Sequence, residues 1–265
     1  MSNHAQHFFE RGWCRFGSDP ELLEWVRPAL AAARAARQEP AHGKWLRYQG
    51  TWFAGVNVLA NAADGAVGDS GPLRGRAIDF IVAELGLAGF AWDRAQVSIC
   101  YPGYPQPMAG ESLARTRYRR ERDAAHVDGL LREGADQRRH LREHHGFILG
   151  IPMVEFDAQA SPFVVWEGSH EIMRASFAER FAGIAPESWG DEDITDAYHV
   201  ARERAFRECR RVEIHARPGE SLLAHRLSLH GMAPWAEGAQ AGPDGRMICY
   251  FRPPVLGPYE WLLNP

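Results

Sequence analysis

Six short β-rich segments in the C-terminal two-thirds of the chain constrain the fold more than any other feature of the sequence. They read QVSICY (from Gln96), FILGIPMVEF, PFVVWEG, RRVEIHA, SLLAHRLSL and RMICYFR. Proline and glycine turns, or a helical insert near residues 193–207, separate them. Short strands with such punctuation are typical of a barrel or a sandwich. We therefore expect a β core over residues 96–256 and a short C-terminal tail over 257–265.

The first 95 residues carry helical signals instead. The sequence SDPE at residues 18–21 has the S-x-x-E form of a capping box, and an alanine-rich run from Leu22 to Arg37 follows it. Apolar residues recur at helical spacing again between Leu73 and Leu87. A chain of 265 residues with 45% apolar content can close one large core. We expect a single domain over 1–265, mainly β with flanking helices.

Charge, hydropathy and cysteine content exclude several classes of function. The net charge is −4 and the chain has no basic tail, so we expect no nucleic-acid partner. No stretch approaches the roughly 18 apolar residues of a membrane span, so we expect no membrane partner and a cytoplasmic location. The four cysteines form no CxxC pair, which argues against a disulfide framework or a cysteine zinc site.

The basic residues are almost entirely arginines. Lys44 is accompanied by 29 arginines, which disfavours chemistry that needs a lysine nucleophile or a phosphate-loop lysine. Any side chain that anchors a carboxylate by charge should therefore be an arginine.

The segment from Asp123 to Gly129 contains an H-x-D motif, His126-Val127-Asp128. Residues i and i+2 of an extended chain share a face, so the imidazole and the carboxylate can reach one metal ion. Two histidines and one carboxylate, with open positions left on the metal, suit Fe(II) oxygen chemistry. By itself the motif is weak evidence in a chain with 12 histidines, and the motif alone favours a simple His–Asp hydrogen bond at a strand end.

A second histidine-bearing segment strengthens this interpretation. The run SLLAHRLSLHGMAPW supplies His230, and a glycine-rich loop then leads into a strand that begins at Arg246. We expect the two strands to form a hairpin, which would bring Arg246 beside the end of the His230 strand. A guanidinium there could hold the distal carboxylate of a keto acid through two parallel hydrogen bonds.

Together these motifs resemble the phytanoyl-CoA dioxygenase-like family of Fe(II)/2-oxoglutarate-dependent oxygenases. The resemblance covers roughly Gln96 to Pro254 and rests on His126-x-Asp128, the strand PFVVWEGSH, the His230 strand and the arginine beyond it. It implies a double-stranded β-helix (jelly-roll, cupin-like) core. It also implies that His126, Asp128 and His230 bind Fe(II) as the catalytic residues.

The same resemblance implies 2-oxoglutarate as co-substrate, anchored by Arg246. O2 would be consumed, succinate and CO2 would form, and a small-molecule substrate would be hydroxylated. Halogenases of the superfamily have a small residue at the position of Asp128, so its carboxylate favours hydroxylation.

Two of these assignments have competitors nearby in the sequence. His225 could replace His230, but the odd spacing places the two on opposite faces of a regular strand, and the family pattern favours the histidine followed by glycine. Arg252 has the same parity as Arg246 and could serve as the anchor, although Arg246 lies closer to His230 along the expected hairpin.

Two alternatives from other classes remain. His140-Leu141-Arg142-Glu143-His144 fits the H-x-x-E-H pattern of a zinc-dependent hydrolase, although its neighbours are charged on all sides and lead at once into an apolar strand. The protein could also be a metal-binding β-barrel without turnover, which would not need Arg246 close to the metal.

An arginine-rich stretch precedes the iron motif and bears on the substrate. Arg115, Arg117, Arg119, Arg120 and Arg122 could attract an anionic substrate, but acidic neighbours dilute them. We favour a mobile lid or a solvated face over residues 102–122. Five aromatic residues could line a pocket, or simply belong to the core: Trp52, Tyr101, Tyr104, Trp166 and Trp235.

Overall fold

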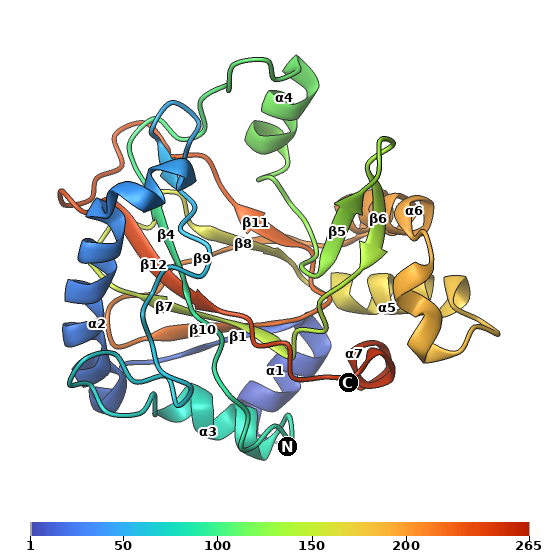
Figure 1. Ribbon diagram of the computed structural model, residues 1–265, viewed down its shortest axis with the longest axis horizontal. Helices are drawn as coiled ribbons and strands as arrows, with labels where there is room; N and C mark the ends of the chain where they lie inside the picture. Colours follow the sequence, from blue (N-terminus) through green and yellow to red (C-terminus); the bar gives the residue numbers. More distant parts are fainter. Residues whose placement is uncertain (1, 265) are drawn as a thin grey trace.

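The computed structural model describes residues 2–264 (Figure 1). Its strands are β1 (Trp13–Phe16), β2 (Leu46–Arg47), β3 (Trp52–Phe53), β4 (Gln96–Cys100), β5 (Leu130–Glu133), β6 (Arg138–Leu141), β7 (Phe147–Pro152), β8 (Phe163–Trp166), β9 (Arg211–Ile214), β10 (Ser221–His225), β11 (His230–Met232) and β12 (Arg246–Phe251). Its helices are α1 (Asn3–Arg11), α2 (Pro20–Gln38), α3 (Arg76–Ala83), α4 (Leu113–Glu121), α5 (Ser169–Arg180), α6 (Thr195–Glu208) and α7 (Pro258–Leu263), with short 3-10 helices η1 (Pro40–Trp45) and η2 (Pro186–Asp191).

Two antiparallel sheets form the centre of the molecule. The larger has seven strands in the order β1-β10-β7-β12-β4-β3-β2, and the smaller has three in the order β11-β8-β9. Their inner faces share one apolar cluster, which joins Phe163 of β8 and Ile214 of β9 to Ile148 of β7 and Ile248 of β12. Helices α1, α2 and α3 cover the outer face of the large sheet (Figure 1). Strands β5 and β6 form a separate hairpin, and α5, α6 and α7 lie on the same side of the molecule as this hairpin.

Strand β12 shows how the two faces of the large sheet differ. Met247, Cys249 and Phe251 point into the core beneath the helices, whereas Ile248 and Tyr250 point toward the smaller sheet. This alternation follows from the two-residue period of a strand. The side chains that share the parity of Ile248 therefore lie between the sheets.

The expected fold class is confirmed at the level of a large antiparallel sheet with flanking helices. Each of the six β-rich segments contains a strand, and helices α2 and α6 occupy the regions expected for a helix and a helical insert. The second expected helix is shorter than its apolar pattern, because α3 covers only Arg76–Ala83. Within residues 2–264, the structure has no helix both long and apolar enough to cross a membrane.

The first 95 residues and the tail contain elements beyond those predicted. Besides helices, residues 1–95 contribute strands β1, β2 and β3, which complete the large sheet. The cap of α2 is Asp19 rather than Ser18, since one Asp19 oxygen accepts from Glu21 N at 3.0 Å and the other from Arg76 N at 2.7 Å, which ties α2 to α3. The C-terminal tail carries helix α7.

The expected hairpin of the His230 and Arg246 strands is wrong as well. Strand β11 pairs with β8 in the small sheet, and β12 pairs with β4 and β7 in the large one. The chain therefore crosses between the sheets after β11. Arg246 still comes close to β11, with Nη1 3.6 Å from the sulfur of Met232, because the two sheets face each other.

Candidate metal centre

A pair of backbone hydrogen bonds joins the two segments that carry the candidate ligands. His126 N donates to His230 O at 2.8 Å, and His230 N donates to His126 O at 3.0 Å. The chain reaches this position from the end of α4 through Asp123 and Ala124, both in the left-handed region with φ of 53° and 54°. The bridge holds the two imidazoles on neighbouring chains, with ring centroids 4.6 Å apart.

The turn before His126 is fixed by groups that are distant in sequence. Arg211 donates to both carboxylate oxygens of Asp123 at 2.7 and 2.8 Å. The carbonyl of Asp123 accepts from Met232 N at 2.8 Å and lies where a Cβ on Gly231 would be. A glycine directly after His230 is therefore required for this close approach.

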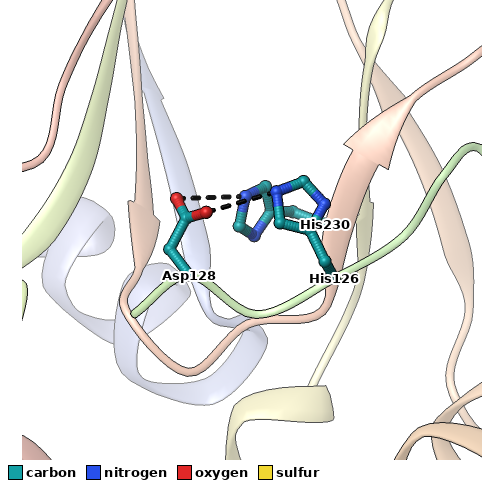
Figure 2. Close-up of side chains that lie close together, drawn as sticks. All are labelled: His126, Asp128 and His230. Atoms are coloured by element: carbon teal, nitrogen blue, oxygen red, sulfur yellow. Dashed lines mark ion pairs between the residues drawn. The ribbon is translucent and has the colours of Figure 1, made fainter. Parts of the chain in front are cut away.

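The three candidate ligands converge in space (Figure 2). His126 Nε2 lies 3.2 Å from Asp128 Oδ1, and His230 Nε2 lies 3.6 Å from Asp128 Oδ2. One ligand atom from each residue lies within 4.8 Å of the others, and no further group of three such residues occurs within residues 2–264. The side chains of Asp128 and His230 are buried, while that of His126 is 46% exposed.

Backbone carbonyls determine which nitrogen of each ring carries the proton. His126 Nδ1 lies 3.0 Å from Ala124 O, and His230 Nδ1 lies 2.9 Å from Ser228 O. A carbonyl can only accept a hydrogen bond, so Nδ1 is the protonated nitrogen in the neutral ring. The lone pairs of both Nε2 atoms then face the carboxylate of Asp128. Hydrogen bonds of this kind typically orient metal-binding histidines.

The pKa shifts of the site favour the charge states that bind a cation. Burial lowers the pKa of His230 below its usual value and outweighs the opposing effect of Asp128, so the ring is neutral near pH 7. Burial acts to raise the pKa of Asp128, but the positive charge of Arg252 opposes this effect, and the pKa lies well below its usual value. A neutral His230 ring thus faces an ionised carboxylate.

This donor set fits a metal ion. Two nitrogen lone pairs that point at carboxylate oxygens 3.2 and 3.6 Å away repel them unless a cation lies between. Two imidazoles and one carboxylate from one side leave the remaining positions of an octahedral ion free for other ligands.

A cavity of about 350 Å³ opens beside the three ligands. Its wall contains the ligands together with Tyr48, Trp52, Val56, Gln96, Ser98, Tyr104, Asp123, Ala124, Ile148, Phe163, Gly231, Met232, Tyr250 and Arg252. Tyr48 stacks on Trp52 at 5.7 Å, and Tyr104 lies against both rings. Of the five aromatic residues considered from the sequence, Trp52 and Tyr104 line this cavity, while Trp166 and Trp235 pack in apolar clusters.

The two arginines considered as anchors lie in different settings. Arg246 is fully buried, and its Nη2 donates to the hydroxyl of the cavity residue Tyr250 at 2.9 Å. Its Nε has no hydrogen-bond partner, and it forms no ion pair within residues 2–264. Arg252 lines the cavity itself, and its Nη1 donates to Asp128 Oδ2 at 3.2 Å.

The competing histidines lie elsewhere. His225 lies at the end of β10 and contacts Arg174 and the ring of His170 rather than the three ligands. His140 is in strand β6 rather than on a helix, and Glu143 and His144 follow in the connection to β7. The hydrolase alternative is thus without the helix that its spacing requires.

The arginine-rich stretch contains a helix and one buried arginine. Residues 113–121 form helix α4. The side chain of Arg119 is buried: its Cζ lies 4.1 Å from the centroid of the Tyr48 ring, and its guanidinium forms an ion pair with Glu111. Arg115, Arg117, Arg120 and Arg122 are exposed, and no arginine of this stretch lines the cavity.

Comparisons with known proteins give distant structural likenesses. No protein-family model matches the chain, and a search of curated proteins finds no match. The solved structures that resemble it include SnoK, a non-haem alpha-ketoglutarate-dependent carbocyclase from nogalamycin biosynthesis, with 12% identity over 95% of this chain and 83% of that chain and a TM-score of 0.47. The epimerase SnoN in complex with Fe3+, alpha-ketoglutarate and nogalamycin RO has 12% identity over 96% and 86%, with a TM-score of 0.48. EctD from S. alaskensis with bound Fe has 14% identity over 95% and 75%, again with a TM-score of 0.48.

Proposed function

We propose that the protein is an Fe(II)/2-oxoglutarate-dependent dioxygenase that hydroxylates a small molecule. It would be a single domain with a double-stranded β-helix core, similar to the phytanoyl-CoA dioxygenase-like family. His126, Asp128 and His230 would hold the iron, and Arg246 would anchor 2-oxoglutarate. When bound, this pair would supply an oxidant from O2, with succinate and CO2 as the other products.

The observation that carries the proposal is the arrangement of lone pairs around Asp128. Both imidazoles use Nδ1 to donate to a carbonyl and turn Nε2 toward the carboxylate, which for neutral rings is favourable only around a cation. Two histidines and one carboxylate are the ligand set of non-haem Fe(II) oxygenases, which need open positions for O2 and a co-substrate.

The isolated charge of Arg246 supports a dianionic co-substrate. A buried guanidinium without an acidic partner is costly unless a ligand supplies the opposite charge. Tyr250 accepts a hydrogen bond from Arg246 and also lines the cavity, so its hydroxyl could contact the same carboxylate as the guanidinium. A metal-binding barrel without turnover would have no use for this buried charge.

The cavity wall supports a small substrate that enters over aromatic side chains. Tyr48, Trp52, Tyr104 and Phe163 offer ring faces on which such a molecule could pack and keep water from the metal. An anionic substrate could still be attracted by the exposed arginines of α4 before it reaches the cavity.

Anaerobic titration tests the proposal directly. Fe(II) followed by 2-oxoglutarate should produce the weak visible charge-transfer band of the chelate in the wild-type protein. His126→Ala and Asp128→Ala should lose both Fe(II) binding and the band, because each removes one of three ligands. Circular dichroism should remain that of the wild type, since neither residue belongs to an apolar cluster.

The double variant His140→Ala/His144→Ala is the matched control, because it removes two histidines from the same chain outside the metal group. It should bind Fe(II) and form succinate as the wild type does. Loss of metal in this control, or full 2-oxoglutarate turnover in Asp128→Ala, would sink the assignment.

A further inference from the structure

Arg252 lies directly after β12 and is held at both its main chain and its side chain. Its backbone N–H donates to the two carboxylate oxygens of Asp93 at 3.0 and 3.1 Å. Its Nη1 donates to Asp128 Oδ2 at 3.2 Å, and the side chain is only 20% exposed. An arginine fixed at both ends in this way can set the orientation of the carboxylate that it contacts.

The two oxygens of Asp128 have different surroundings. Oδ1 faces His126 Nε2 at 3.2 Å, whereas Oδ2 receives the guanidinium of Arg252 and lies farther from His230 Nε2, at 3.6 Å. The guanidinium thus occupies one oxygen, while the other faces the imidazole. The residue after Asp128 is Gly129 at a φ of 82°, so the carboxylate extends from a tight turn and not from a paired strand.

We propose that Arg252 is a positioning residue for the metal centre: it holds Asp128 so that one carboxylate oxygen is kept from the metal and the other is presented to it. The inference rests on the proposed function, because it assumes that Asp128 is a metal ligand. As a ligand, Asp128 would then offer the metal the oxygen that faces His126 rather than the oxygen that Arg252 contacts.

Two effects of Arg252 on metal affinity have opposite signs, so the sign of the change is informative. Its positive charge repels a divalent cation, and removing that charge alone would tighten binding. Its hydrogen bond orients a ligand, and losing a partner of this kind typically weakens metal affinity by about 10- to 100-fold. A positioning role requires the second effect to exceed the first.

The test compares Arg252→Met, which removes charge and donors, with Arg252→Lys, which retains the charge without the planar fork. Anaerobic titration with Fe(II) alone gives the metal dissociation constant, and titration of Mn(II)-saturated protein with 2-oxoglutarate gives the co-substrate constant. Arg34→Met is the control, because Arg34 donates three hydrogen bonds to Asp244, which precedes the opposite end of β12 from Arg252.

Arg252→Met and Arg252→Lys should both weaken Fe(II) binding by about tenfold or more, and Arg34→Met should not change it. The affinity of the Mn(II)-saturated protein for 2-oxoglutarate should stay within about threefold of the wild type in both variants. If Arg252→Met fails to fold, Arg252→Lys provides the same comparison with the charge kept.

Tighter Fe(II) binding in Arg252→Met would overturn the proposal, because Arg252 would then act only through its charge. Unchanged metal affinity together with at least tenfold weaker 2-oxoglutarate binding would also overturn it and make Arg252 the co-substrate anchor. Absence of Fe(II) binding in the wild-type protein would instead refute the proposed function, so the two failures can be told apart.

Discussion

The two faces of the large sheet are built from the same strands but have different contents. Beneath helices α1, α2 and α3, the sheet contributes apolar side chains such as Val97, Leu149 and Phe251. On the face toward the small sheet, the same strands carry Ser98, Tyr250 and the buried charge of Arg246 beside the cavity. Because successive side chains of a strand point to opposite faces, neighbouring residues such as Tyr250 and Phe251 lie on different faces of the sheet.

The two faces therefore serve different purposes: one stabilises the fold, and the other carries the candidate binding groups. The apolar face can contribute free energy of folding without any polar group to satisfy, whereas the cavity face retains groups that are costly to bury without a ligand. Variants of neighbouring residues in β12 should therefore have separable effects: on the helix face they should change stability, and on the cavity face they should change binding.

The largest expected effect is on stability, from Phe251→Ala. Phe251 is fully buried and its ring lies 5.0 Å from that of Trp92 and 5.9 Å from that of Trp25. Removing such a ring typically costs about 3–5 kcal/mol of the free energy of unfolding. Urea denaturation measures this change. Val200 is exposed, so the control variant Val200→Ala should change the free energy of unfolding by about 0.5 kcal/mol or less. A small loss in Phe251→Ala together with weakened metal binding would break the comparison.

The next effect is on co-substrate binding, from Arg246→Ala. Truncating one partner of a desolvated charge pair costs about 2–5 kcal/mol, so the affinity for 2-oxoglutarate should fall at least tenfold. Arg246→Lys should recover only part of the loss, because it keeps the charge without the fork. Calorimetry on the Mn(II)-saturated protein measures both values. Unchanged affinity in Arg246→Ala would remove Arg246 as the anchor.

A smaller effect is expected at α4, whose Arg119 contacts the cavity residue Tyr48. Arg119→Met should loosen α4, because it removes the pair with Glu111 and the contact with the ring of Tyr48. Limited proteolysis within residues 102–122 should become several-fold faster, while Arg120→Met, at an exposed neighbour, should behave as the wild type. Equal rates in the two variants would show that Arg119 does not fasten the segment.

The smallest effect concerns the thiols on the two faces. Burial raises the pKa of Cys100, on the cavity side, and of Cys249, under the helices, to about 12 each, and that of Cys209 to about 11. The thiolate is the reactive form, so all three should resist alkylation at pH 8. Mass spectrometry after iodoacetamide treatment should find slow labelling of half-buried Cys209 only. Fast labelling of Cys100 would indicate that the cavity face opens in solution.

The strands and the principal candidate ligands were predictable from the sequence. β-branched and aromatic runs between turn residues indicate strands locally, and the H-x-D spacing predicts that His126 and Asp128 can reach one ion, although Asp128 lies in a turn and not in a strand. The same parity rule placed Arg246 and Arg252 on one face of their strand, and the structure has the side chains of Ile248 and Tyr250 on that face. The roles of these residues in binding stay predictions.

Only the tertiary structure decided which sheet each strand joins and which groups orient the ligands. A local pattern made β11 and β12 look like a hairpin, but strand partners depend on long-range burial, and the chain crosses between sheets after β11. The contacts of Arg252 with Asp128 and of Arg211 with Asp123 span 124 and 88 residues. Sequence periodicity reports which face a side chain occupies in its own element; it carries no information about which distant charge the fold brings opposite to it.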